Sequence, residues 1–256
     1  MSGKILAVTS GKGGVGKTFF AANVAAALAA RGENVLVLDA DLGLANLDVV
    51  LNLHPKITLH DVFTEKATLE QAILPAPGGF SVLLAGSGLV EYSRLTPQVR
   101  DQLLDIIEKV SPRFDRILLD TGAGISDVVL HAVSMADDVL VIVTPEPTSM
   151  TDAYATIKVL ATLQGRRAIR LVVNQVSSQG EGRTIRNQLQ LVVDRFVRPQ
   201  LVSQGVTEAL MLELLGEIPI DPAVREAVQR RSLLMVGMPG CPAAQAISMI
   251  AAKMTG

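Results

Sequence analysis

The composition of this 256-residue chain predicts a large buried core and argues against several classes of protein. Hydrophobic residues make up 49% and the mean hydropathy is +0.39, yet no apolar run is long enough to cross a bilayer. A formal net charge of −2 and only 3% aromatic residues argue against coating nucleic acid by charge or stacking. The single cysteine, Cys241, allows neither an internal disulfide nor a Cys-x-x-Cys metal site. We therefore expect one cytoplasmic domain over residues 1–256, without a signal peptide before the first strand.

The stretch from Ser10 to Thr18 has the spacing of a phosphate-binding loop, G-x-x-x-x-G-K-[ST]. It lies between residues 5–8, typical of a buried parallel strand, and residues 19–30, an Ala-rich helix former. Backbone N–H groups of such a loop surround phosphate oxygens, and the next helix points its positive N-terminus at them. Lys17 would reach the β- and γ-phosphates of ATP, and the Thr18 hydroxyl would bind Mg²⁺. The expected nucleotide contacts are Gly11, Lys12, Gly13, Gly14, Val15, Gly16, Lys17 and Thr18. A glycine-rich turn with an incidental lysine is the plain structural alternative.

Two carboxylates end the second predicted strand, residues 35–38. Asp39 and Asp41 would lie at the carboxyl edge of the sheet, where parallel folds bind ligands. Asp41 could instead cap the next helix. Further along, we expect short helices over 57–73, a strand and a small-residue loop over 80–88, and an amphipathic helix over 97–110.

An apolar strand over 115–120 ends in Asp120, the Walker B pattern, whose carboxylate would hold Mg²⁺ through a water. Residues 138–144 read as another strand, followed by a helix beginning near Met150. The strand at 171–176 contains Asn174, whose amide offers a donor and an acceptor to an adenine edge. The chain's scattered histidines are assigned no metal or catalytic role.

Lys12 adds an early second lysine to the loop, in the form Lys-Gly-Gly-x-Gly-Lys-Thr. This form resembles the deviant Walker A motif of the MinD/ParA family of dimerising ATPases. The resemblance implies that Lys12 reaches the nucleotide of a partner subunit, so that ATP lies between two protomers. A solvated loop charge is the alternative.

The same family resemblance extends along the chain. Residues 39–48 resemble switch I, which implies that Asp41 orients the attacking water and Asp39 supports the Mg²⁺ shell. Residues 121–126 resemble switch II, where a glycine such as Gly122 senses the γ-phosphate. The resemblance also implies that Glu146 contacts nucleotide across the dimer, that Asn174 binds the base, and that the loop 216–221, with Pro219 and Asp221, closes over it. Asp152 would lie on the face used by regulatory partners, although an ordinary acid in the first helical turns explains it equally well.

Two segments pose questions of membrane and DNA binding. The helix expected over 183–198 carries four arginines, for which we favour a solvated face over DNA contact. The tail, 243–254, is expected to be a helix with Ile247, Ile250 and Met254 on one side. This helix either packs on the domain or touches a membrane weakly in the ATP state, where Lys253 would add little.

These observations predict a doubly wound α/β fold with a mostly parallel sheet of seven or eight strands flanked by helices. The resemblance implies a slow ATPase that forms an ATP-bound homodimer with Mg²⁺ and separates after hydrolysis. Residues 39–48 and 120–126 are most similar to those of flagellar-number regulators, which implies control of flagellar number or placement at the membrane or the cell pole. The implied partners are a signal-recognition-type (SRP-type) GTPase, a flagellar switch-complex protein or an AAA+ transcription activator. Direct activation of the GTPase is not expected, since no extension precedes Lys4. The alternatives are a division-site or segregation ATPase and an ATP-gated antiactivator.

Overall fold

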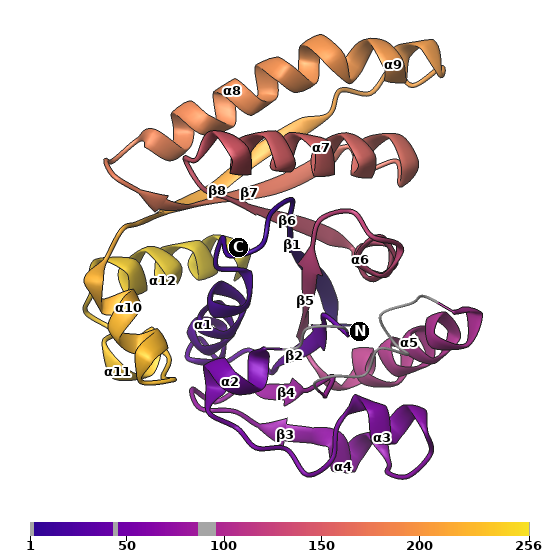
Figure 1. Cartoon of the computed structure of the whole chain (residues 1–256), viewed down its shortest axis with the longest axis vertical. Coiled ribbons are helices and arrows are strands. Elements are labelled where there is room, and N and C mark those ends of the chain that lie inside the picture. Colours follow the sequence, from indigo (N-terminus) through magenta and orange to yellow (C-terminus); the bar gives the residue numbers. More distant parts are fainter. Residues whose placement is uncertain (1–2, 43–45, 87–95, 256) are drawn as a thin grey trace.

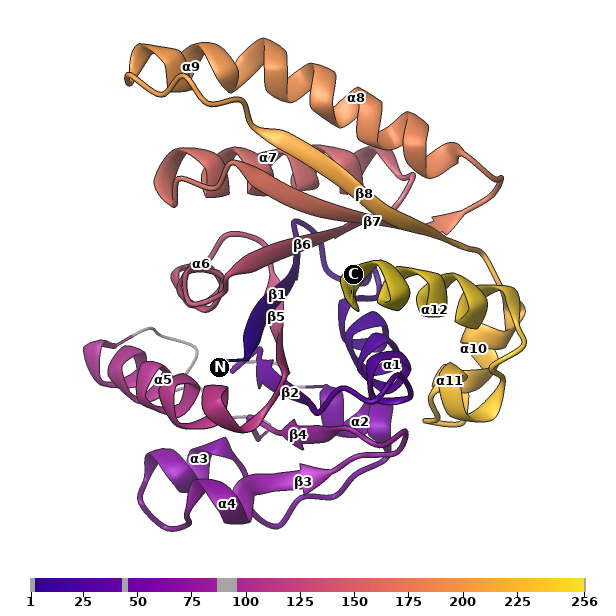
Figure 2. The same ribbon diagram turned by 180° about the vertical axis from the view of Figure 1, so that it is seen from behind.

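An eight-stranded sheet organises the part of the chain that the computed structural model describes, residues 3–42, 46–86 and 96–255. The strand order is β3-β4-β2-β5-β1-β6-β7-β8, and every neighbouring pair is parallel except the antiparallel pair β3 and β4. Helices cover both faces of this sheet (Figures 1 and 2). The doubly wound, mostly parallel α/β fold is confirmed. The strands are β1 (Lys4–Ser10), β2 (Val35–Ala40), β3 (Ile73–Pro75), β4 (Ser81–Leu83), β5 (Arg116–Ala123), β6 (Asp138–Val143), β7 (Ala168–Val176) and β8 (Met211–Pro219).

The helices divide between the two faces of the sheet. Helices α1, α2, α10, α11 and α12 contribute to the core on one face. Helices α3 to α9 contribute to the core on the other face. The helices are α1 (Lys17–Ala29), α2 (Leu47–Leu51), α3 (Leu59–Phe63), α4 (Leu69–Ala72), α5 (Pro97–Val110), α6 (Asp127–Ser134), α7 (Pro147–Leu163), α8 (Glu181–Phe196), α9 (Arg198–Ser203), α10 (Pro222–Gln229), α11 (Leu234–Gly237) and α12 (Pro242–Thr255).

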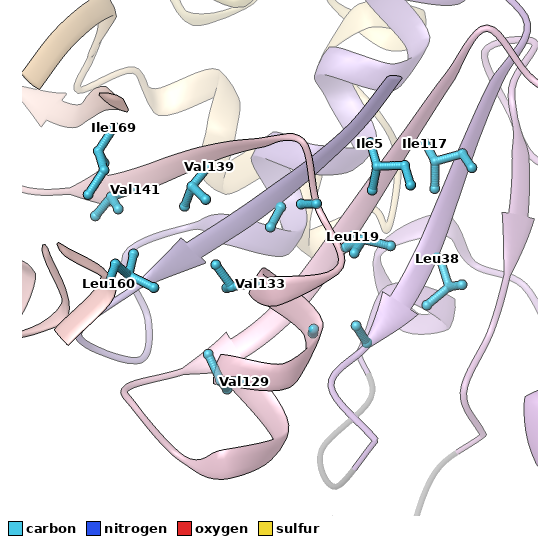
Figure 3. Close-up of a cluster of buried hydrophobic side chains, with 14 of the residues drawn as sticks. Ile5, Leu38, Ile117, Leu119, Val129, Val133, Val139, Val141, Leu160 and Ile169 are labelled. Carbon is cyan, nitrogen blue, oxygen red and sulfur yellow. The ribbon is translucent and has the colours of Figure 1, made fainter. Parts of the chain in front are cut away.

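Alternate residues of the central strands feed two separate apolar cores. Ile5 and Leu119 pack toward α6 and α7 in the cluster drawn in Figure 3, whereas Leu6 and Leu118 pack toward α1 and α12. The side chains on both faces of the central strands are buried, because helices cover each face. These strands therefore consist almost entirely of apolar residues. This explains the high hydropathy of the sequence.

Helix α5 begins and ends where its sequence pattern predicts. The Thr96 hydroxyl accepts a hydrogen bond from the Val99 N–H at 3.2 Å, and Pro97 occupies the first turn. The five apolar residues expected on its inner side, Val99, Leu103, Ile106, Ile107 and Val110, are all buried. Helix α7 begins at Pro147 rather than near Met150, since proline is preorganised for a first helical position.

The segment 216–221 is largely strand, so the prediction of a loop was wrong for residues 216–219, while the expected base contact of Pro219 and Asp221 stays a prediction. Residues 216–219 belong to β8 and pair with β7, with Gly216 opposite Val172. A Cβ on Gly216 would lie 2.5 Å from the Ile250 side chain, so this glycine permits close packing of α12. The basic segment also differs from expectation, because α8 ends at Phe196 and Arg198 begins α9. Residues 43–45 of the switch I-like stretch and residues 87–88 lie outside the described residues.

The tail helix α12 packs on the domain and does not present its apolar side to solvent. Ile247, Ile250 and Met254 are buried among residues of α1 and β8, and the Lys253 ammonium donates to the Leu215 carbonyl at 2.6 Å. In this arrangement the three side chains belong to the core, as the first of the two readings of the tail expects. Among the described residues, no helix is both long and apolar enough to span a bilayer.

Two adjacent residues of α12 provide a test of this packing. Ile250 is 1% exposed and Met249 is 63% exposed. We expect Ile250→Ala to lower the free energy of unfolding by about 2–5 kcal/mol, because it removes buried methylene groups and leaves a cavity. Met249→Ala, the matched control, should change it by less than about 0.5 kcal/mol. Urea denaturation of both variants measures the difference, and equal effects would contradict the docked helix.

Candidate functional site

The phosphate-binding loop connects β1 to α1 as predicted. Gly14 and Gly16 have φ angles of 78° and 95°, the left-handed region in which glycine avoids strain, and Gly16 directly precedes α1. A Cβ on Gly11 would lie 2.2 Å from the main chain of Asp152, so the start of the loop packs closely against α7. The loop's backbone and the N-terminus of α1 together form the expected anion-binding turn.

Asp39 and Asp120 lie directly opposite each other on neighbouring strands β2 and β5. They are 1% and 2% exposed, and one oxygen of each, Asp39 Oδ2 and Asp120 Oδ1, has no hydrogen-bond partner. Burial raises the pKa of Asp120 to about 7, against the opposing effects of a hydrogen bond from Thr18 and the Lys17 charge. Burial and the nearby Asp120 raise the pKa of Asp39 well above its usual range. Burial lowers the pKa of Lys17, while Asp120 and Asp41 oppose this shift.

A magnesium ion fits this donor set. Two buried carboxylate oxygens without partners, next to a threonine hydroxyl, are the hard oxygen ligands and negative charge that Mg²⁺ prefers. Among the described residues there is no cluster of three or more His, Cys, Asp or Glu side chains able to hold a metal by themselves. That agrees with Mg²⁺, which usually takes one or two carboxylates together with waters and substrate phosphates.

A pocket of about 620 Å³ brings several predicted residues together; Asp39 and Asp120 do not line it, although Asp120 is hydrogen-bonded to Thr18, which does. Lys17, Thr18, Asp41 and Gly122 line it, together with Gly13, Gly14 and Gly16. A Cβ on Gly122 would approach the Asp41 carboxylate to 3.4 Å, so the two switch-like segments meet here. Asp41 does not cap the next helix, because Asn46 holds that position before α2.

Sequence reasoning missed part of the pocket wall. Asn46, Ser126, Val128 and Phe19 also line the pocket. Ser126 was detectable as a helix N-cap directly after the switch II-like loop, since its hydroxyl accepts from the Val129 N–H. Asn46 lies in the switch I-like stretch and Phe19 directly follows the loop, so both were near a predicted motif, whereas Val128 carries no local signal.

Lys12 does not line this pocket and is bound at the N-terminus of α7. Its ammonium donates to Glu146 Oε2 at 2.8 Å and to Thr148 Oγ1 at 3.0 Å. Neither Lys12 nor Glu146 is among the pocket-lining residues. The two side chains predicted to reach a partner's nucleotide are thus bound to each other in the single chain.

Asn174 and Asp221 make contacts within the protein. The Asn174 amide donates to the Val15 carbonyl of the phosphate-binding loop at 2.8 Å, and its oxygen accepts from the Gln175 N–H. Both Asp221 oxygens accept from helix N-termini, the N–H of Ala223 in α10 and that of Ala243 in α12. Asn174, Pro219 and Asp221 are absent from the pocket lining. Asn174 therefore braces the loop, whereas Asp221 joins two helices.

The raised pKa of Asp120 predicts a pH-dependent stability of the ligand-free protein. Between the ordinary value of 3.8 and about 7, the folded protein holds a proton that the unfolded chain has released. The free energy of unfolding should therefore fall as the pH rises through this window, by up to about 1.4 kcal/mol per pH unit. Asp120→Asn should make that slope shallower, with Asp39, whose pKa is also raised, supplying the remainder, whereas Asp105→Asn, an exposed control, should not change it. Urea denaturation at several pH values from acid to neutral measures the free energy of unfolding of the wild type and both variants. The same pH dependence in all three proteins would contradict the raised pKa of Asp120.

Comparison with known proteins gives a consistent match over nearly the full chain. A family model named ParA, described as a NUBPL iron-transfer P-loop NTPase, matches residues 2–255. The chain is 40% identical over 250 residues to the antiactivator FleN of Pseudomonas aeruginosa, covering 98% of this chain and 85% of that protein. It is 32% identical over 250 residues to the flagellum site-determining protein YlxH of Helicobacter pylori, covering 97% and 80%.

A solved structure adds a nucleotide-bound relative. MinD of Pyrococcus horikoshii complexed with Mg-ADP superimposes with a TM-score of 0.75 and 27% identity, over 98% of this chain and 95% of that one. The match in fold and sequence, together with the loop, the paired carboxylates and the pocket, agrees with nucleotide binding. The chain belongs to the ParA/MinD family of P-loop ATPases.

Proposed function

We propose that this protein is an ATP-driven, dimerising switch that controls flagellar number or placement. The observation that carries the flagellar part is its near-full-length similarity to FleN and YlxH, whose names describe an antiactivator and a flagellum site-determining protein. The ATP-dependent part is supported by the phosphate-binding loop and the pocket beside it.

Within one chain, the proposed roles follow from position. Lys17 and the loop N–H groups bind the phosphates, and Asp41, next to Gly122, orients the attacking water. Thr18 and Asp120 would hold Mg²⁺, with Asp39 behind them, and the ion would neutralise phosphate charge. Asn174 keeps the loop in place through Val15 and thereby acts on nucleotide indirectly, in addition to the base contact implied by the family resemblance.

The dimeric part of the proposal rests on Lys12. In the single chain its ammonium is bound to Glu146 and Thr148 at the surface. This ion pair is more than a third exposed at each residue, so it contributes little stability and can be exchanged for a phosphate contact. ATP-bound dimerisation would move Lys12 to the nucleotide of the second protomer and free Glu146 to contact it as well.

Lys12→Ala tests the action of this residue across the dimer. We expect ATP turnover to fall by about 10³-fold or more, because a cation that stabilises the transition state from a partner subunit contributes that much elsewhere. ADP binding should remain close to normal, because Lys12 does not line the pocket of its own chain. Lys4→Ala, an exposed lysine at the start of β1, is the control. Phosphate-release assays at saturating ATP, with light scattering for the dimer, give the readout, and near-normal turnover would refute this role.

The flagellar role is tested in cells. Deletion of the gene should change the number or position of flagella counted by electron microscopy, and the wild-type gene should restore them. Complementation with Asp41→Ala separates two mechanisms, because an antiactivator that acts only by ATP-gated binding still represses without hydrolysis. Unchanged flagella in the deletion strain would exclude the flagellar role and leave division-site, segregation or other positioning functions.

The proposal also includes a partner protein and a location in the cell. An SRP-type GTPase, a flagellar switch-complex protein or an AAA+ activator is the proposed partner at the inner face of the membrane or the cell pole. Support comes from the relative named as an antiactivator. Because the apolar side of α12 is packed on the domain, we favour a partner protein over the tail as the source of the location.

A further inference from the structure

A second cavity, of about 350 Å³, shares helix α6 with the nucleotide pocket. Asp127, Leu130, His131 and Ser134 line the second cavity, at the spacing of one helix face. Residues 126, 128 and 129 line the nucleotide pocket instead. Helix α6 directly follows the switch II-like loop, so it forms a wall common to both spaces.

Two buried acceptors in this cavity have no partner. His131 is 7% exposed; its ring is hydrogen-bonded to the main chain of Arg100, and its Nε2 is unpartnered. Gln164 donates from Nε2 to the Leu130 carbonyl at 2.6 Å, which leaves its Oε1 buried and unpartnered. Burial and the Arg100 charge lower the pKa of His131, so at neutral pH the free ring nitrogen is an acceptor. A ligand that reaches these two atoms needs N–H or O–H donors.

The same cavity carries one group of each charge. The Arg100 guanidinium lines it at the beginning of α5, and the Asp127 carboxylate lines it at the beginning of α6. Neither forms an ion pair with another residue of the described part of the chain. The N-terminus of α5 adds positive potential beside Arg100.

We propose that this cavity binds a small zwitterion, a free α-amino acid, between α5 and α6. Its ammonium group has three N–H donors, which match the three acceptors His131 Nε2, Gln164 Oε1 and the Asp127 carboxylate. Its carboxylate meets Arg100, whose forked guanidinium is suited to carboxylate binding. The side chain of the ligand occupies the rest of the cavity.

A ligand in this cavity would contact the same helix that lines the nucleotide pocket. Any ligand that favours one position of this helix changes the affinity of the neighbouring pocket for nucleotide, and nucleotide changes the affinity for the ligand equally. This inference concerns regulation and does not depend on the flagellar role, so either can fail alone.

Histidine NMR tests the site on the full-length, nucleotide-free protein. The chain has three histidines, so a ¹³C-histidine spectrum has few ring signals, and His131→Gln assigns the relevant one. The probes are glycine, L-alanine and L-leucine, with methylammonium and acetate as probes of single charge. We expect an amino acid to shift the His131 signal saturably and more than either single-charge probe.

Substitution of Arg100 makes the test specific. Arg100 is exposed, so Arg100→Met should fold, and it should weaken amino-acid binding by about tenfold through loss of a charged hydrogen bond. Arg183→Met, on the exposed face of α8, should leave binding unchanged. The proposal is overturned if no amino acid moves the signal, which indicates a water-filled cavity, or if acetate alone moves it as much. Unchanged binding in Arg100→Met would overturn it as well.

Discussion

The structure of the site depends on the burial of two like charges at one edge of the sheet. Asp39 and Asp120 face each other across β2 and β5, and the Lys17 ammonium, itself partly desolvated, acts on Asp120. In the ligand-free protein this arrangement is costly, as the raised pKa of each carboxyl shows. Mg²⁺ would supply positive charge beside these carboxylates, so its binding would relieve an unfavourable interaction already present in the fold.

The phosphate-binding loop is tied by direct contacts to neighbouring strands and helices. Asn174 ties the loop to β7 through Val15, Gly11 lies against the main chain of α7, and Lys12 is bound to the start of that helix. Gly122 and Asp41 meet in the nucleotide pocket, and α6 begins five residues after Gly122. The phosphate-binding loop is therefore in contact with α7, which carries the Lys12 ion pair at its start. The switch II-like segment beside the loop leads directly into α6, which lines the second cavity.

One side chain that resembles a family site residue makes structural hydrogen bonds in this chain. Asp221 joins the N-termini of α10 and α12, and so holds the tail helix on the domain. With Ile250 packed on Gly216, this contact explains why a segment with an amphipathic pattern is part of the core. Periodicity alone could not separate the two outcomes, because a helix needs the same apolar stripe for a protein core as for a membrane surface.

The sequence by itself determined the fold class, the loop and the carboxylates. The glycine spacing and the apolar strands that end in Asp39 and Asp120 are local patterns with a direct physical meaning, and the inner face of α5 followed from its period. Only the tertiary structure decided that Lys12 pairs with Glu146, that residues 216–219 continue a strand, and that His131 and Gln164 share a cavity. These contacts join residues 33 to 134 positions apart in the chain, and no local propensity records which acceptor a side chain meets when the elements pack.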